Sequence, residues 1–275
     1  MTSKNLIQVT LEHDTGKEAV MTRVDKKVSD MFIDDENSRW DSYYYHPKFD
    51  EIEKLIGKFE IKRLKSLDNF TITTGSGSKR IYTPGGGVRY IQNINIRNTG
   101  IDYSIRLIEI KENSEIDRQD TRIKKEDVLF NRSGEGTLGR SIYLALEPSK
   151  ANISNDVYLI RNSEIEQAYL STYLMCFYGQ MYIDKESHGV SGLTKINTSD
   201  ISKIKIPIIP QSVQRQVKSR YNSVAEWHDK AMQCREKKDE EGYNKNIKQA
   251  ENVLKDLISE LEQVIRGEKE AINES

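Results

Sequence analysis

The spacing of apolar positions changes along the chain, and each change predicts a different kind of element. Over residues 48–56, Ile52, Leu55 and Ile56 fall on one helical face, so a short amphipathic helix is predicted there, after a polar break. From 60 to about 146, short apolar runs alternate with polar residues and with clusters of Gly, Ser and Pro, which is typical of β-strands joined by turns. The predicted strands lie at 61–64, 70–74, 88–91, 104–110, 128–130 and 142–146.

Beyond this region, apolar residues recur at steps of three and four. The first such stretch, 165–184, predicts one helix lying on the sheet. Residues 204–210 then read as an extended, proline-containing boundary, and from 211 onward two further helical series follow. The second series forms a heptad seam of Ile247, Ala250, Leu254, Leu257, Leu261 and Val264.

This seam leaves three arrangements open: a helix packed on its own domain, a helical hairpin, or a coiled coil. The narrow apolar stripe and the charged faces around it favour the last two. The seam residues Ile247, Leu254, Leu257, Leu261 and Val264 are expected to form a dimer or partner surface. Two helices placed end to end would span on the order of 90 Å, and about half that if they fold back.

The predicted fold is therefore α+β. Residues 1–45 are an N-terminal lead-in of unknown role, residues 46–210 are a β-rich domain with packed helices, and residues 211–275 are a long C-terminal helical or coiled-coil region.

Composition narrows the functional classes. The 275 residues contain 36% hydrophobic and 31% charged residues, with no apolar run near the roughly 18 residues that a membrane span needs. No apolar signal segment is seen near the N-terminus, and the two cysteines, Cys176 and Cys234, form no CxxC, so the cytoplasm is the expected compartment. The net charge is −1, but residues 61–205 carry 21 basic against 17 acidic side chains, a mildly basic stretch that could face phosphates.

Catalytic motifs are weak. Residues 134–139 spell GxGxxG, but a strand-like run follows where dinucleotide binding needs a helix, so we interpret the glycines as a loop between two strands. Asp102 with Glu109 and Lys111 could mimic a metal-dependent nuclease, although Glu-x-Lys is common in so charged a chain. No two prolines are adjacent, as a base methyltransferase would require, and no metal or catalytic site is predicted.

The remaining chemistry lies in loops rich in hydrogen-bond donors. Arg pairs with guanine, Asn or Gln with adenine, and Ser or Lys with phosphate, so such loops suit DNA readout. The candidate DNA-binding residues are Ser76, Lys79, Arg80, Arg89, Gln92, Asn93, Asn95, Arg132, Arg140, His188, Ser191 and Lys195.

Several segments resemble the DNA-specificity subunits of type I restriction–modification systems. Residues 87–95, the run Asp127-Val128-Leu129 with Gly134 and Gly139-Arg140, and residues 151–154 are similar to family segments. The most specific likeness is the run from His188-Gly189 through 206–210 to Gln214, which resembles the family's exit from its recognition domain into a long helix.

The resemblance implies that 46–210 is a target-recognition domain that reads one half of a bipartite duplex site, and that 211–275 is a spacer. It implies a non-catalytic chain: S-adenosylmethionine, Mg and ATP would be bound by partner subunits, namely a methyltransferase (modification) subunit and possibly a restriction subunit. Since a full specificity subunit has two recognition domains and this sequence has room for one, pairing with a second copy or another half-subunit is expected. The alternatives are a methyltransferase or nuclease fragment with its own chemistry, and a coiled-coil interaction scaffold.

Overall fold

The structure, a computed structural model, describes residues 6–14, 19–27, 44, 46–77, 83–106, 108–187 and 194–273, and it divides into two compact units at Leu55 and Ile56. In the first unit, strands β1 (Leu6–Asp14) and β2 (Ala19–Lys27) form an antiparallel hairpin that pairs Leu6 with Lys27 and Asp14 with Ala19. The lead-in thus contains two strands.

Helix α2 (Pro47–Ile56) occupies the range predicted for the first helix. Phe49, Ile52 and Ile56 are buried at a spacing of three and four residues. Leu55 is 46% exposed, so its predicted place on the buried face is wrong. Phe49 takes that place because positions 49, 52 and 56 keep closer to one helical stripe than positions 52, 55 and 56.

The described residues of the second unit form three sheets. The largest is antiparallel, with strand order β4 (Thr71–Thr74), β10 (Val157–Arg161), β7 (Val128–Asn131) and β8 (Ser141–Tyr143). A second sheet orders β6 (Glu109–Lys111), β5 (Gly87–Ile91) and β9 (Ala151–Ile153), with β5 and β9 parallel. The third pairs β3 (Ile61–Arg63) with β11 (Lys205–Pro207). Side chains from the two larger sheets share one apolar cluster, which joins them into a single core.

Short helices connect these strands. The 3-10 helices are η2 (Leu64–Ser66), η3 (Asn93–Asn95) and η4 (Gln119–Thr121), and the short α-helix α5 (Thr198–Ile201) precedes β11. The predicted strand at 104–110 shrinks to β6, because Ser104 hydrogen-bonds to Asp102 and Arg106 has a positive φ of 43°, so this part of the chain turns.

The single helix predicted over 165–184 is two helices, α3 (Gln167–Met175) and α4 (Phe177–Glu186). The break falls at Cys176, whose backbone is extended, and Gly179 permits the close return of the chain, since a Cβ there would lie 2.1 Å from the Tyr173 carbonyl oxygen. Helix α3 packs on β8 and β7, as the sequence predicted for a helix on the sheet.

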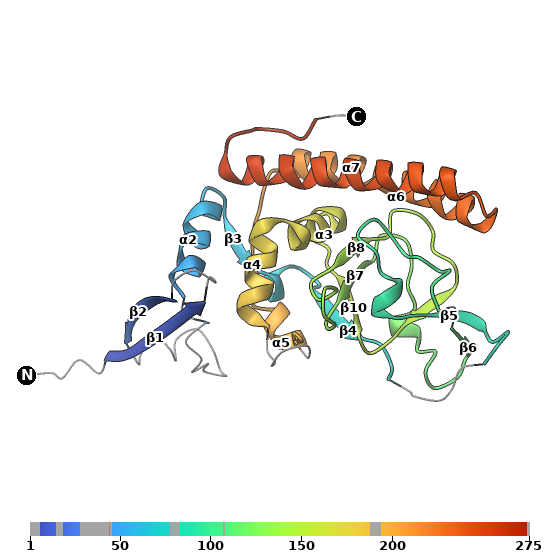
Figure 1. Cartoon of the computed structure of the whole chain (residues 1–275), viewed down its shortest axis with the longest axis horizontal. Coiled ribbons are helices and arrows are strands. Elements are labelled where there is room, and N and C mark those ends of the chain that lie inside the picture. The colour runs from blue at the N-terminus through green and yellow to red at the C-terminus, as the bar shows by residue number, and fades with distance from the viewer. Residues whose placement is uncertain are drawn as a thin grey trace, which may run out of the picture. The chain divides into compact units, whose positions relative to one another are not determined.

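Helices α6 (Gln211–Glu236) and α7 (Glu240–Arg266) form an antiparallel hairpin. Asp239 caps α7 by accepting a hydrogen bond from the Gly242 amide at 2.9 Å, and Gly267 ends it in the left-handed conformation. Both helices contact α3, so α3 lies between the hairpin and the four-stranded sheet, as Figure 1 shows. Each helix is about 40 Å long. This agrees with the alternative in which the two helices fold back on each other and span about half of 90 Å.

Inside the hairpin, the predicted seam is buried. Leu254, Leu257, Leu261 and Val264 are at most 4% exposed within the single chain, and Ile247 is half-buried. The expectation that this seam forms a dimer or partner surface is therefore corrected: α6 and α3 of the same chain cover it.

Candidate nucleic-acid interface

Polar side chains gather where several strands of the second unit end. Ser76 follows β4 and bridges to Ser154, which follows β9. The Ser154 amide donates to the Ile91 carbonyl at 2.8 Å. Gln92, the first residue after β5, therefore lies beside Ser154. Gly75 makes this approach possible, since a Cβ at this position would lie 2.0 Å from the Ile153 carbonyl oxygen.

The ends of β7 and β10 complete this edge. The Arg132 amide donates to the Asp156 carbonyl at 3.1 Å, and the Ser133 hydroxyl donates to the Asp156 carboxylate at 3.0 Å. Asn93 donates to the Ser133 carbonyl at 3.4 Å, and Lys195 forms a β-bridge with Ser133. We call this surface the polar edge; it consists of Ser76, Gln92, Asn93, Arg132, Ser133, Asn155 and Lys195.

Arg132 is the most distinctive member of the polar edge. Its guanidinium carbon lies 5.2 Å from the centre of the Tyr158 ring, a cation–π contact that fixes the side chain. Among the described residues its only hydrogen-bond acceptor is the Asn155 carbonyl, at 3.4 Å, and its Nε is buried without a partner. No described carboxylate forms an ion pair with it, so most of its donor capacity is unused.

Lys195 adds a second cation that is exposed and has no ion pair among the described residues. Among the described residues, the carboxylate of Asp156 adjoins this edge, where it accepts the Ser133 hydroxyl. The charge balance of the polar edge is therefore positive, which suits an anionic ligand.

Asn95 does not belong to this surface. It is 3% exposed, its Nδ2 donates to the Asp102 carbonyl at 3.1 Å, and its Oδ1 accepts from the Gln92 amide at 2.9 Å. Its hydrogen-bonding groups serve the fold, so its predicted role in DNA binding is wrong.

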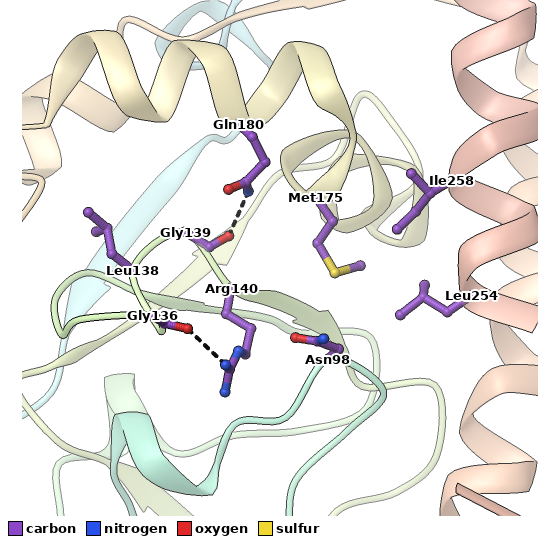
Figure 2. Close-up of a pocket in the computed structure, with 9 residues that line it drawn as sticks. All are labelled: Asn98, Gly136, Leu138, Gly139, Arg140, Met175, Gln180, Leu254 and Ile258. Atoms are coloured by element: carbon purple, nitrogen blue, oxygen red, sulfur yellow. Dashed lines mark hydrogen bonds between the residues drawn. The ribbon is translucent and has the colours of Figure 1, made fainter. Parts of the chain in front are cut away.

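Arg89 and Arg140 lie beside the helical hairpin. The Arg89 guanidinium stacks on Tyr103, 4.5 Å from the ring centre, and both line a cavity of about 250 Å³ along α6. Arg140 donates to the carbonyls of Ile96 at 3.0 Å and Gly136 at 2.9 Å. Figure 2 shows Arg140 in a cavity of about 360 Å³ that is also lined by side chains of α7. The side chains of these two arginines therefore line cavities beside the hairpin.

Four candidates, Lys79, Arg80, His188 and Ser191, lie outside the described residues. Of the twelve, the polar edge brings together Ser76, Gln92, Asn93, Arg132 and Lys195.

The glycine-rich motif is a loop between β7 and β8, as interpreted from the sequence. Gly134, Gly136 and Gly139 all have positive φ, and a Cβ at Gly134 would lie 2.9 Å from the side-chain nitrogen Nδ2 of Asn93. In the second weak motif, Asp102 has a structural role. Burial opposes ionisation of Asp102, but hydrogen bonds from Ser104 and the charge of Arg235 outweigh it and lower the pKa of this carboxyl. Among the described residues, no group of three or more metal-binding side chains could hold a metal ion.

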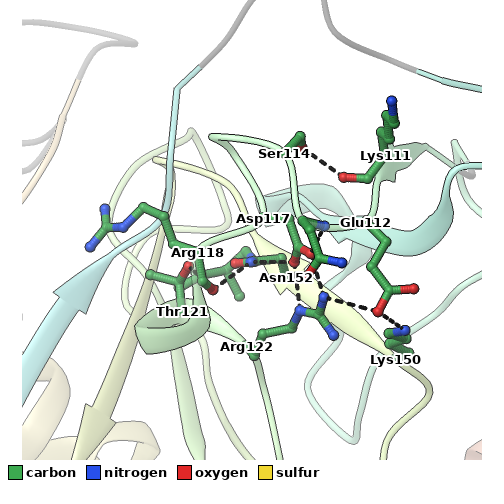
Figure 3. A network of polar contacts seen from close by, with 11 residues as sticks. Lys111, Glu112, Ser114, Asp117, Arg118, Thr121, Arg122, Lys150 and Asn152 are labelled. Atoms are coloured by element: carbon green, nitrogen blue, oxygen red, sulfur yellow. Dashed lines mark hydrogen bonds and ion pairs between the residues drawn. The ribbon is translucent and has the colours of Figure 1, made fainter.

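A polar network that the sequence did not predict anchors residues 112–122 to β9. Arg122 donates through Nε to Asp117 at 2.5 Å and also pairs with it through Nη2, while Asn152 donates to Asp117 at 3.2 Å (Figure 3). Glu112 contacts both Arg122 and Lys150. Burial opposes the charge on Asp117, but these donors outweigh it and lower the pKa of the carboxyl. The network fixes the strand whose last residues lead into the polar edge.

Asp127, at the start of β7, has a similar structural task. Its carboxylate pairs bidentately with Arg161 of β10, at 2.6 and 2.8 Å, and also accepts from the Lys124 amide at 2.8 Å. This pair ties together the ends of β7 and β10 opposite those at the polar edge.

Comparison with known proteins supports a family. A family model described as type I restriction modification DNA specificity domain matches residues 56–220, more than half of the chain. A search of curated proteins finds no matching relative. None of the described helices is long and apolar enough to cross a membrane.

Solved structures show distant likeness. The type I system S subunit from M. genitalium is 14% identical over 65% of this chain and 41% of its own, with a TM-score of 0.41. The HsdS subunit from Thermoanaerobacter tengcongensis is 13% identical over 78% of this chain and 52% of its own, with a TM-score of 0.41. The type IIG restriction endonuclease BpuSI is 11% identical over 87% and 36%, with a TM-score of 0.48. The chain thus spans about half or less of each of these proteins.

Proposed function

We propose that this chain, which belongs to the family of type I restriction–modification DNA specificity domains, binds duplex DNA through its polar edge and reads one half of a two-part site. The observation that carries the assignment to this edge is Arg132. Its side chain stacks on Tyr158 at the polar edge while most of its donors stay unused. Arg89 is also stacked, on Tyr103, but it lines the cavity along α6.

The chemistry of the edge suits base readout. A guanidinium can donate two parallel hydrogen bonds to the O6 and N7 atoms of guanine in the major groove, and an Asn or Gln amide can do the same for adenine. Arg132 supplies the first group, and Gln92 and Asn93 supply the second. Lys195 carries the exposed charge that a phosphate requires.

The chemical steps belong, in this proposal, to partner subunits. A methyltransferase subunit would bind S-adenosylmethionine and transfer the methyl group, and a restriction subunit, where present, would use ATP and Mg. We place no catalytic group on this chain. Pairing with a second copy or another half-subunit remains part of the proposal, but it must use a surface other than the buried seam of α7.

The test measures duplex binding by fluorescence anisotropy, with a pool of random-sequence duplexes, at several salt concentrations. The chain is measured alone and with the modification subunit of its own system. Binding should be strongest with the partner and should weaken with salt, and sequencing of the retained duplexes should yield a defined half-site. Absence of duplex binding at low salt in both samples would overturn the proposal.

Variants then locate the surface. Arg132→Ala should weaken binding to the selected duplex by about 1–3 kcal/mol and relax the preference at one base position, whereas Lys195→Ala should weaken binding to all sequences alike. Lys255→Ala, an exposed lysine on α7, is the matched control and should change neither. Melting temperatures establish that each variant is folded. If Arg132→Ala and Lys255→Ala bind equally well, the polar edge is not the interface.

A further inference from the structure

One loop runs from the polar edge to the helical hairpin. It starts at Gln92, directly after β5, passes through η3, and turns at residues 102–106. Its first residues belong to the polar edge, whereas its later residues contact α6. Residues 92–104, called the linking loop below, thus touch both parts of the second unit.

At the hairpin end, two residues of α6 hold the linking loop. Arg235 forms an ion pair with Asp102, whose side chain is 1% exposed, and donates to the Ser104 hydroxyl at 3.2 Å. The Arg235 guanidinium also lies over the ring of Tyr243 of α7, 3.8 Å from its centre. Both helices of the hairpin therefore fix this arginine.

His228 holds the same loop about two turns earlier in α6. Its Nε2 lies 3.1 Å from the Ile101 carbonyl, which can only accept, so Nε2 carries the proton. In the neutral ring Nδ1 then accepts the Thr99 hydroxyl at 2.8 Å. Gly100, between Thr99 and Ile101, lies so close to the imidazole ring that a Cβ at this position would be 2.5 Å from it.

At the other end of the linking loop, Asn95 connects Asp102 to the polar edge through hydrogen bonds. Asp102 and Asn95 exchange two hydrogen bonds: the Asp102 amide donates to the Asn95 carbonyl at 2.8 Å, and the Asn95 side chain donates to the Asp102 carbonyl at 3.1 Å. Asn95 in turn accepts from the Gln92 amide at 2.9 Å. A continuous path of buried or half-buried bonds thus leads from Arg235 to Gln92.

We propose that Arg235 and Asp102 are positioning residues for DNA recognition, which through Asn95 set Gln92 and Asn93 in the orientation that reads their bases. This inference rests on the proposed function. It assigns the hairpin a second task beyond any spacing role: it holds one part of the reading surface in place.

This path also implies that binding at the hairpin and binding at the polar edge affect each other's free energy. A ligand that orders Gln92 and Asn93 must favour the same arrangement of the linking loop that the hairpin favours. A subunit that contacts the hairpin near Arg235 should therefore change the affinity for DNA, and DNA should change the affinity for that subunit by the same factor.

The experiment compares base preference rather than affinity alone. The half-site selected by the full chain is changed one base pair at a time, and the affinity for each duplex is measured for wild type, Gln92→Ala, Arg235→Ala and the double variant. Arg235→Ala should weaken binding by roughly 2- to 30-fold, a range typical of residues that act through a network. The loss of preference should fall at the base position that Gln92→Ala also affects, and the double variant should lose little more than either single one.

Two further variants separate positioning from general stability. Tyr221→Phe removes a different α6 contact, the hydroxyl that accepts from the Tyr143 amide at 3.2 Å, and it should lower stability while leaving base preference unchanged. Arg235→Lys retains a cation for Asp102 and should recover part of the preference. If Arg235→Ala does not fold, the base preferences of Arg235→Lys and Asp102→Asn are compared with those of wild type instead.

The outcomes are distinct from those of the proposed function. If wild type binds no duplex, the proposed function fails and this inference fails with it. If wild type selects a half-site and Arg235→Ala keeps the same base preferences, or loses affinity equally for every duplex, only the positioning role is overturned.

Discussion

Replacing Leu257 with alanine tests whether the hairpin seam is an internal core or an intermolecular surface. The Leu257 side chain is 0% exposed within one chain, between α6 and α7. Truncation of a fully buried leucine removes its transfer free energy and leaves a cavity, which together cost about 2–5 kcal/mol of unfolding free energy. In a chain of this size each kcal/mol lowers the melting temperature by about 2–4 °C, so a cost near 3 kcal/mol predicts a fall of roughly 6–12 °C.

Calorimetry and light scattering after size-exclusion chromatography measure the two consequences on the same samples. Leu257→Ala should lower the melting temperature while the oligomeric state stays that of wild type. Lys255→Ala, exposed on the same helix, should stay within about 0.5 kcal/mol of wild type. A Leu257→Ala protein with an unchanged melting temperature that has lost a wild-type dimer would refute the reasoning, because the seam would then be buried between chains.

Three further changes probe buried groups. Burial raises the pKa of the Cys176 thiol to about 12, so iodoacetamide at pH 8 should leave Cys176 unmodified in the native protein and alkylate it in urea, as mass spectrometry of the peptides can show. Burial lowers the pKa of His228. The unfolded chain therefore takes up a proton below about pH 6.5 that the folded chain resists, and stability should fall between pH 7 and pH 5 more steeply in wild type than in His228→Gln. Asp127→Asn weakens the bidentate pair with Arg161, which is 29% exposed, and should cost about 1–3 kcal/mol in urea unfolding; no loss would mean that this pair does not hold β7 to β10.

The sequence predicted elements best where local pattern and tertiary packing agree. The helix at 48–56 and the strand at 128–130 appear within a residue or so of their predicted ends. The extended, proline-containing stretch is also found, since β11 lies within it and α6 begins directly after it. In each case the pattern of apolar residues matches a buried face, so nothing in the tertiary structure opposes the local preference.

The elements that were predicted incorrectly differ from the structure for specific physical reasons. The apolar run at 104–110 looks like a strand, but the side chains of Asp102 and Asn95 hydrogen-bond to the backbone and turn it. The periodicity of 165–184 is helical throughout, yet it does not reveal the extended residue at Cys176. The heptad seam correctly marks a buried face, but periodicity does not say which chain covers that face.

Residue type alone also does not separate a reading side chain from one that serves the fold. Asn95 and Asn93 are two residues apart, and either could pair with adenine. Asn95, however, stands three residues after Gln92, at the position where a polar side chain bonds back to the start of a helical turn, and the structure shows this capping pair. The same spacing rule, applied to the sequence, would have assigned Asn95 to the backbone and left Gln92 and Asn93 as candidates. In the positioning role proposed above, Asn95 is therefore the residue on which the orientation of Gln92 and Asn93 depends.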